Sequence, residues 1–156
     1  MTDEQRDKQY KEMHAQIVAL ITGETDVIAN MANISAVLFN GLKDINWAGF
    51  YLFKEDQLVL GPFQGQPACI RIPMGKGVCG SAALEERTFV VDNVHEFDGH
   101  IACDAASNSE IVVPVFSAEH KLLGVLDVDS PLYERFTNSD KIGLEAIAKA
   151  LTATLQ

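Results

Sequence analysis

The sequence has few of the features on which secreted or membrane-spanning proteins depend. It contains three cysteines, and no stretch approaches the ~20 apolar residues of a membrane-spanning helix. The N-terminus, which begins Met1-Thr2-Asp3-Glu4, has no apolar export segment. Cysteines in a chain without an export signal favour a reducing compartment, where a disulfide is usually transient and catalytic. We therefore expect a cytoplasmic protein.

Basic residues, repeats and linkers are also scarce or absent. Twelve Lys and Arg stand against 22 Asp and Glu, which gives a formal net charge of −10, and no basic cluster offsets it. Such a chain repels a phosphate backbone, so nucleic acid is an unfavourable partner and the acidity mainly confers solubility. The length of 156 residues is typical of one domain, and we expect one over residues 1–156.

Helical patterns lie at both ends of the chain and strand patterns between them. No glycine or proline occurs from Asp3 to Ile21, and Asp26 suits the start of a second helix, whose apolar residues recur at helical spacing. We expect strands at 47–53, 58–60, 69–72, 88–91, 111–116 and 122–128, a short helix through 82–85 and a last helix from 139 to about 155. This order predicts an α+β fold with a mostly antiparallel sheet, an N-terminal helix pair and a C-terminal helix.

A long irregular connection at residues 92–109 carries Cys103 among small and polar residues. Connections of this length inside a domain are often functional. A structural cysteine usually has apolar neighbours, whereas a reactive one needs access and nearby groups that set its thiolate fraction. Cys69 and Cys79 lie upstream as candidate disulfide partners, so the pattern favours redox chemistry over hydrolysis.

Three carboxylates are expected to converge near this connection. Asp127 and Asp129 share one face of the last strand, and Glu110 begins the preceding strand, so a hairpin would bring them together. Such a cluster can bind an ammonium group, and it raises the pKa of at least one member so that a proton is available near neutral pH. The alternative is that both aspartates lie at a solvated strand end and cap the turn at Ser130-Pro131.

Trp47 and the two upstream cysteines also have two interpretations each. Trp47 could wall the pocket and contact a methyl group, or it could be an ordinary core tryptophan. Cys79 follows a glycine-rich turn and precedes a helix, whose N-terminus could lower the thiol pKa or bind a substrate carboxylate. The glycines could equally do no more than shape a tight turn. Cys69, in a strand pattern, could be a plain core residue.

Four segments carry a family resemblance: Asn46–Tyr51, Gly75–Gly80, Ala102–Glu110 and Leu123–Ser130. With the three cysteines, they resemble the free methionine-R-sulfoxide reductases, which are single-domain GAF-fold enzymes, and the resemblance runs from about residue 10 to the end. It implies a GAF-like fold and reduction of free methionine-R-sulfoxide to methionine, with no metal and no organic cofactor. It also implies a homodimer.

The resemblance assigns a role to each candidate residue. It implies that Cys103 is the catalytic cysteine, Cys69 the resolving cysteine and Cys79 an auxiliary thiol. The implied substrate-binding positions are Trp47, Glu110, Asp127 and Asp129. In the expected cycle Cys103 becomes a sulfenic acid, condenses with Cys69 to a disulfide, and is recycled by thioredoxin or a similar dithiol.

Other classes of site fit the sequence less well. His95, His100 and Cys103 could suggest zinc, but the set lacks a CxxC pair and a fourth ligand. A Cys-His hydrolase would need hydrogen-bond donors that stabilise an oxyanion, and the sequence shows no motif for them. The main alternative is a GAF module that senses a small ligand. Such a sensor would not need Cys103 beside three carboxylates, and consumption of free methionine sulfoxide by purified protein with a thiol reductant would discriminate the two.

Overall fold

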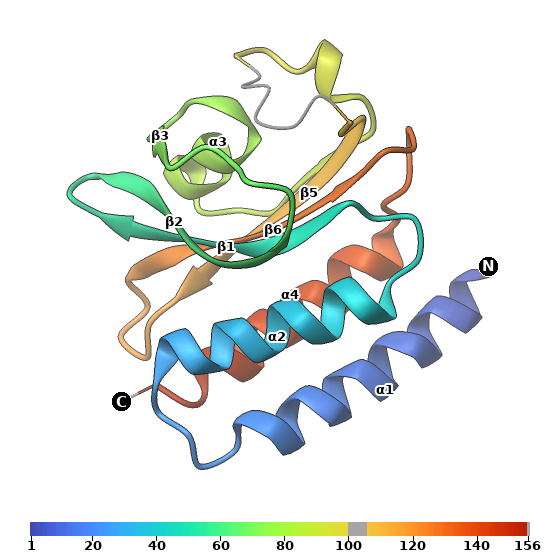
Figure 1. The fold of residues 1–156 in the computed structure, drawn as a ribbon, viewed down its shortest axis with the longest axis vertical. Helices are drawn as coiled ribbons and strands as arrows, with labels where there is room; N and C mark the ends of the chain where they lie inside the picture. Colours follow the sequence, from blue (N-terminus) through green and yellow to red (C-terminus); the bar gives the residue numbers. More distant parts are fainter. Residues whose placement is uncertain (100–105, 156) are drawn as a thin grey trace.

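The structure, a computed structural model, describes residues 1–99 and 106–155, and places a sheet between two unequal layers (Figure 1). Its strands are β1 Trp47–Lys54, β2 Gln57–Gly65, β3 Arg71–Pro73, β4 Phe89–Val91, β5 Ser109–Phe116 and β6 Leu122–Ser130. Their order is β3-β2-β1-β6-β5-β4, with every neighbouring pair antiparallel. This architecture confirms the predicted α+β class with a mostly antiparallel sheet. Cys103 and His100 lie outside the described residues.

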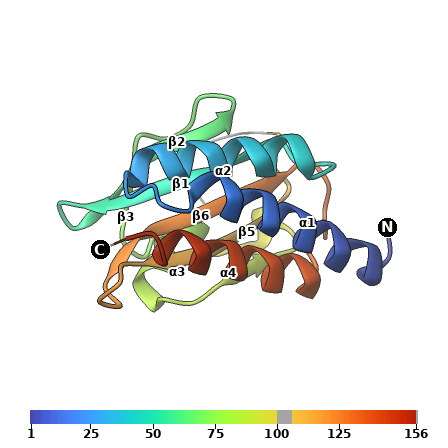
Figure 2. The same ribbon diagram turned by 90° about the horizontal axis from the view of Figure 1, so that it is seen from below.

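Three long helices lie on one side of the sheet, as Figures 1 and 2 show: α1 Asp3–Ile21, α2 Val27–Gly41 and α4 Asn138–Thr152. Helices α2 and α4 cover the sheet, and α1 packs on these two helices. Polar residues fix where these helices begin. The Thr2 hydroxyl accepts a hydrogen bond from the Gln5 backbone N–H, and Asp26 accepts one from Ala29. No helix among residues 1–99 and 106–155 is long and apolar enough to cross a membrane.

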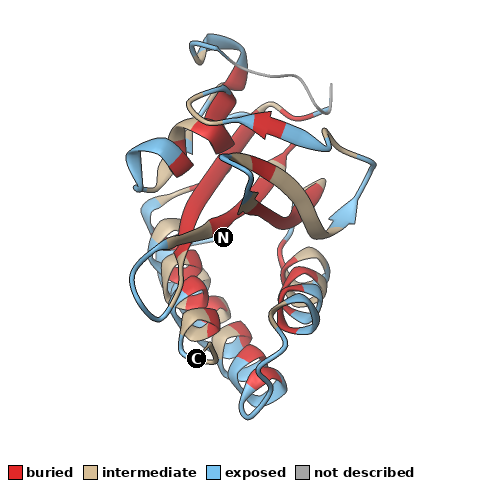
Figure 3. Ribbon diagram, turned by 90° about the vertical axis from the view of Figure 1, so that its left-hand side faces the viewer, coloured by how far each residue is buried: buried red, intermediate tan, exposed pale blue. Residues whose placement is uncertain are grey.

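Each face of the sheet has its own apolar core because strand side chains alternate between faces. On the helical face, Phe50, Ile111 and Leu126 are fully buried against the long helices. On the opposite face, Tyr51 and Val112 pack with residues of the short helix α3 Gly77–Glu85. A 3-10 turn, Val94–Glu96, follows β4. The central strands are accordingly buried along most of their length (Figure 3).

The N-terminal helix is tied to the C-terminal helix by a buried polar contact. The Tyr10 hydroxyl donates to Asp140 Oδ1 at 2.6 Å, and Arg135 lies 3.3 Å from the other carboxylate oxygen. A glycine at position 143 lets the Tyr10 ring lie directly against α4, because any Cβ there would overlap the ring. The helical layer is therefore one packed unit with the sheet.

Several boundaries differ from those expected from the sequence; the second strand, for example, runs over Gln57–Gly65 instead of 58–60. Three of the differences bear on the site. The third strand begins at Arg71, so Cys69 precedes it and is half-buried in a connection instead of lying within a strand. The short helix begins at Gly77, because Gly75 and Gly77 take positive φ angles that turn the chain into it early. The last strand runs to Ser130, so Asp129 pairs within the sheet.

Candidate functional site

The three carboxylates predicted to converge do so on the face of the sheet that α3 covers. Glu110 on β5 is the direct cross-strand partner of Asp129 on β6, and Asp127 lies one pleat further along β6, on the same face. Asp127 is 4 % exposed and Glu110 is 9 % exposed, while Asp129 is partly exposed. The alternative of two aspartates at a solvated strand end is therefore wrong for Asp127, which is paired on both sides by β1 and β5.

Cys79 joins this cluster from the opposite layer. It lies in the first turn of α3, is buried, and is a free thiol. Its Sγ lies 3.7 Å from Glu110 Oε2, a distance at which a thiol donates a weak hydrogen bond to a carboxylate. The glycine-rich turn thus delivers the thiol onto the carboxylates, which lie on the sheet beneath it.

Burial dominates the electrostatics of the cluster. It raises the pKa of the Glu110 carboxyl well above its usual range, and the Asp127 charge raises it further. Burial likewise raises the pKa of Asp127, with the Asp129 charge as the next cause. Burial and the Asp127 charge also raise the pKa of the Cys79 thiol, so the helix N-terminus does not make this cysteine a thiolate.

An aromatic wall stands beside the carboxylates. Trp47 on β1 is the cross-strand partner of Asp129, and its ring stacks on Phe63 with centroids 5.1 Å apart. Tyr51 lies four residues after Trp47 on the same face of β1, and the centroids of the two rings are 5.9 Å apart. Between them Gly49 has no side chain, and any Cβ there would overlap Phe63, so the glycine lets the aromatic wall close. Trp47 is thus a buried residue that also borders the cluster.

The wall holds the segment that carries Cys69. Trp47 Nε1 donates to the Gln66 carbonyl at 3.1 Å, and the Tyr51 hydroxyl donates to the Cys69 carbonyl at 3.0 Å. Burial and the Asp127 charge raise the pKa of Tyr51, so its hydroxyl stays a donor. Cys69 itself is disulfide-bonded.

The described ends of the connection at residues 92–109 are anchored on either side of the cluster. The Gly77 backbone N–H, at the start of α3, donates to the Gly99 carbonyl at 2.9 Å. On the other side the Asn108 N–H donates to the Ser130 carbonyl at 2.8 Å, and His95 Nε2 lies 2.8 Å from Asn108 Oδ1. The sequence between these anchors contains Cys103.

Tyr51 and Phe63 belong to the site but were not identified from the sequence. For Tyr51 a signal existed, because period-2 alternation from Trp47 places it on the same face. For Phe63 no local signal existed, because its contact depends on the irregular register between β1 and β2.

Cys79, Glu110 and Asp127 form the one group of metal-binding side chains within 4.8 Å that occurs in the described part of the chain. A metal ion would need the thiolate form of Cys79, which burial opposes. An ammonium group needs acceptor oxygens alone, so an organic cation suits this cluster better than a metal. Of the zinc candidates considered from the sequence, His100 and Cys103 lie outside the described residues.

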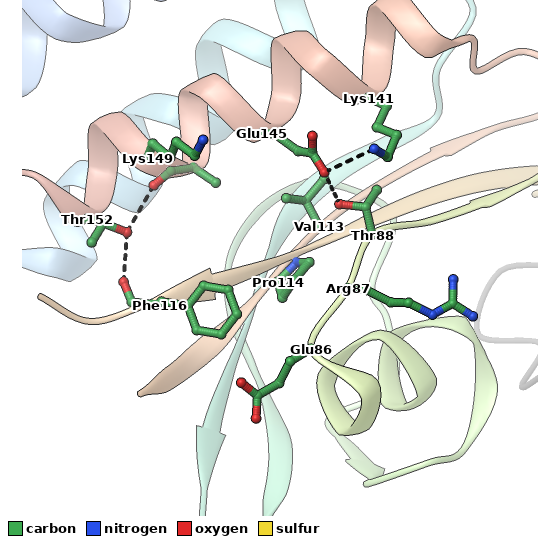
Figure 4. Close-up of a pocket in the computed structure, with 11 residues that line it drawn as sticks. Glu86, Arg87, Thr88, Val113, Pro114, Phe116, Lys141, Glu145, Lys149 and Thr152 are labelled. Carbon is green, nitrogen blue, oxygen red and sulfur yellow. Dashed lines mark hydrogen bonds and ion pairs between the residues drawn. The ribbon is translucent and has the colours of Figure 1, made fainter. Parts of the chain in front are cut away.

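A separate hollow of about 520 Å³ lies at the far end of β5, against α4 (Figure 4). Two of its charged groups pair with each other: Glu145 accepts a hydrogen bond from Thr88 at 2.6 Å and lies 3.6 Å from Lys141. It contains no cysteine and no cluster of like charges, so it offers no equivalent chemistry.

The buried carboxylates predict a characteristic dependence of stability on pH. Between the unfolded pKa of Asp, about 3.9, and the raised folded pKa, the native state binds more protons than the unfolded state. The free energy of unfolding therefore falls as pH rises, by up to about 1.4 kcal/mol per pH unit per group. We expect Asp127→Asn to weaken this fall, so that the variant gains stability relative to the wild type between about pH 5 and pH 8. Urea unfolding of both proteins tests this, and identical pH slopes would contradict it.

The chain is similar in sequence and structure to known GAF-domain proteins. The GAF domain model matches residues 29–156, and a candidate GAF sensor of Burkholderia vietnamiensis has a similar structure, with a TM-score of 0.93, 51% identity and coverage of 96% and 95% of the two chains. The chain is therefore a GAF-domain protein.

Similar proteins also include a named group of oxidoreductases. The free methionine-R-sulfoxide reductase of Escherichia coli is 51% identical over 94% of this chain and 88% of its own length. The enzyme of that name from Neisseria meningitidis, solved in complex with its substrate, gives a TM-score of 0.89 at 46% identity over 93% and 87% of the two chains. The chain belongs to the free methionine-R-sulfoxide reductase family.

Proposed function

We propose that this chain reduces free L-methionine (R)-S-oxide to methionine, with the cluster of Glu110, Asp127 and Asp129 as the substrate site. The observation that carries this proposal is a buried anionic cluster bordered by aromatic rings and by both anchors of the Cys103 segment. Asp127 Oδ1 is buried and accepts no hydrogen bond from any side chain or backbone group in the described ranges. An unsatisfied buried acceptor is costly, and a substrate ammonium or hydroxyl would satisfy it.

The cluster can perform two tasks because its members do not share one protonation state. A carboxyl whose pKa is raised can remain protonated at neutral pH and donate its proton to the sulfoxide oxygen. An ionised neighbour can at the same time bind the ammonium group. Trp47, at the edge of the cluster, can contact the methyl group of the sulfoxide.

The proposed cycle takes its two electrons from the thiols of Cys103 and Cys69. The Cys103 thiolate attacks the sulfoxide sulfur and forms an S–S bond to it while the acid protonates the sulfoxide oxygen. The hydroxyl then passes from the substrate sulfur to the Cys103 sulfur as the S–S bond breaks, so methionine leaves with its sulfur reduced and Cys103 is left as a sulfenic acid. The Cys69 thiol then attacks that sulfur, which releases water and forms a disulfide. A dithiol such as thioredoxin restores both thiols by exchange. No metal or organic cofactor takes part, because the cysteines carry both electrons.

The state of the other cysteines supports these assignments. Cys69 is engaged in a disulfide and Cys79 is a free thiol, which leaves Cys103 as the intrachain partner that we propose for Cys69. Cys69 is half-buried in a connection, where an incoming dithiol has access. Recycling by thioredoxin would place the enzyme in a reducing compartment, the cytoplasm.

We also propose that residues 1–156 act as a single domain and associate as a homodimer. The helix α1, which precedes the family match, is joined to α4 by the buried Tyr10–Asp140 contact. Large apolar side chains remain exposed on the helical layer, including Leu20, Ile28 and Ile142, at 47 %, 48 % and 60 %. Burying them against a second copy would be favourable, and sedimentation would give twice the chain mass.

Selectivity for the free amino acid is the direct test of the proposed function. An N-acylated methionine sulfoxide lacks the ammonium charge, so it would leave the buried carboxylates unpaired, and a site that requires a polar contact rejects such analogues strongly. We expect kcat/KM for N-acetyl methionine sulfoxide to fall by at least about 10²-fold relative to the free sulfoxide. The measurement is methionine formation with a thiol reductant. Equal rates would refute the site assignment, and binding without consumption would favour a sensor.

A further inference from the structure

Cys79 is placed unlike a cysteine that takes part in redox chemistry. It is 5 % exposed, lies in the first turn of α3 and faces the sheet, and it remains a free thiol while Cys69 is disulfide-bonded. A redox cysteine needs a reachable sulfur and a stabilised thiolate. Here burial and three neighbouring carboxylates oppose the thiolate. The sequence-based assignment of an auxiliary thiol therefore requires another chemical explanation.

The contact with Glu110 supplies that explanation. The Cys79 thiol points to Glu110 Oε2 over 3.7 Å, and together with Asp127 these side chains form one cluster within 4.8 Å. A protonated thiol in this position is the donor that reaches the carboxylates from the α3 side. We propose that Cys79 is a positioning residue: its S–H donates to the Glu110 carboxylate and so fixes that group's orientation and protonation for the reaction. This inference rests on the proposed function of the carboxylates and removes Cys79 from the electron-transfer steps.

The direction of the effect follows from the groups that face the cluster. These are Tyr51 on β1, Glu110 on β5, Asp127 and Asp129 on β6, and Cys79 on α3, and every one is neutral or acidic. The hydrogen bond from Cys79 favours the ionised form of Glu110 and lowers its pKa against the effect of burial. Removing the S–H therefore raises the pKa of Glu110 and moves the pH–rate profile to higher pH.

Three variants separate positioning from redox chemistry. Cys79→Ala removes the donor, Cys79→Ser keeps an O–H donor, and Ser81→Ala, on the same helix, controls for disturbance of α3. With dithiothreitol as reductant, we expect Cys79→Ala to shift the profile of kcat/KM upward by about one pH unit, the scale of one hydrogen bond to a charged group. Cys79→Ser and Ser81→Ala are expected to keep the wild-type profile. A redox role predicts instead that Ser and Ala variants are equally impaired with no shift in profile, which would overturn the proposal.

Two further measurements test whether Cys79 acts through Glu110. The first measures turnover, and the second does not depend on it. In a Glu110→Gln background, adding Cys79→Ala is expected to change kcat/KM less than about 2-fold, because the group through which Cys79 acts is already absent. Carboxyl ¹³C titration of Glu110 by NMR should show the raised pKa in Cys79→Ala even if the chain turned over no sulfoxide. That titration thus distinguishes failure of this inference from failure of the proposed function. An unchanged Glu110 titration, or a Cys79 disulfide trapped after oxidation by substrate, would overturn it.

Discussion

Cys103→Ser is expected to abolish methionine formation, including the first turnover. The proposed reaction begins with attack by sulfur on the sulfoxide, and an alkyl hydroxyl is far too weak a nucleophile near neutral pH to replace a thiolate. Loss of the nucleophile leaves binding intact, so the variant should still bind free methionine sulfoxide at the carboxylate cluster. We expect the rate to fall below detection, with a thermal stability measured under reducing conditions that stays close to the wild type.

Cys69→Ser serves as the matched variant because it removes the other cysteine of the proposed pair. The attack by Cys103 remains possible, so this variant should release up to about one methionine per chain rapidly and then slow or stall with thioredoxin. A small thiol can restore slow turnover by attacking the sulfenic acid directly. Single-turnover methionine release from pre-reduced proteins measures both variants. A full burst from Cys103→Ser with none from Cys69→Ser would reverse the two assignments.

Much of the carboxylate cluster could be predicted because it depends on local rules. Alternation along a strand places Asp127 and Asp129 on one face, and a hairpin with its turn near His120 brings Glu110 opposite Asp129. Neither step needs knowledge of distant packing. The helices at both ends followed similarly from capping residues and apolar spacing, and the structure confirms them within a few residues.

What the sequence left open depends on contacts between layers. Whether Cys79 lies near Glu110 is decided by how α3 packs on the sheet, and no local pattern reports that distance. The helix N-terminus suggested a lowered thiol pKa, whereas burial and the carboxylates raise it. The solvated-end alternative for Asp127 failed for a related reason, because the strand continues to Ser130 between two neighbours.

Replacing the carboxylates one at a time should produce the second large effect. Glu110→Gln, Asp127→Asn and Asp129→Asn keep the size of each side chain and remove its charge and acidity. We expect at least about a 10²-fold loss in kcat/KM for Glu110→Gln and for Asp129→Asn, the scale of a lost acid catalyst or a strong polar contact. The carboxyl that donates the proton should show its loss mainly in kcat, and one that binds the ammonium group mainly in KM.

A matched control is available because Glu145 is a carboxylate of the same chain outside the site, where it accepts a hydrogen bond from Thr88. Glu145→Gln should leave kcat/KM within about 2-fold of the wild type, since a substitution remote from the chemistry changes no contact made in the transition state. The buried members have a second signature: because burial raises their pKa values, neutralising them should lower activity while stabilising the protein near pH 8. Loss of activity with loss of stability would indicate unfolding instead. If all three variants kept near-normal turnover, the substrate would bind elsewhere, and the cluster would be a structural feature of the fold alone.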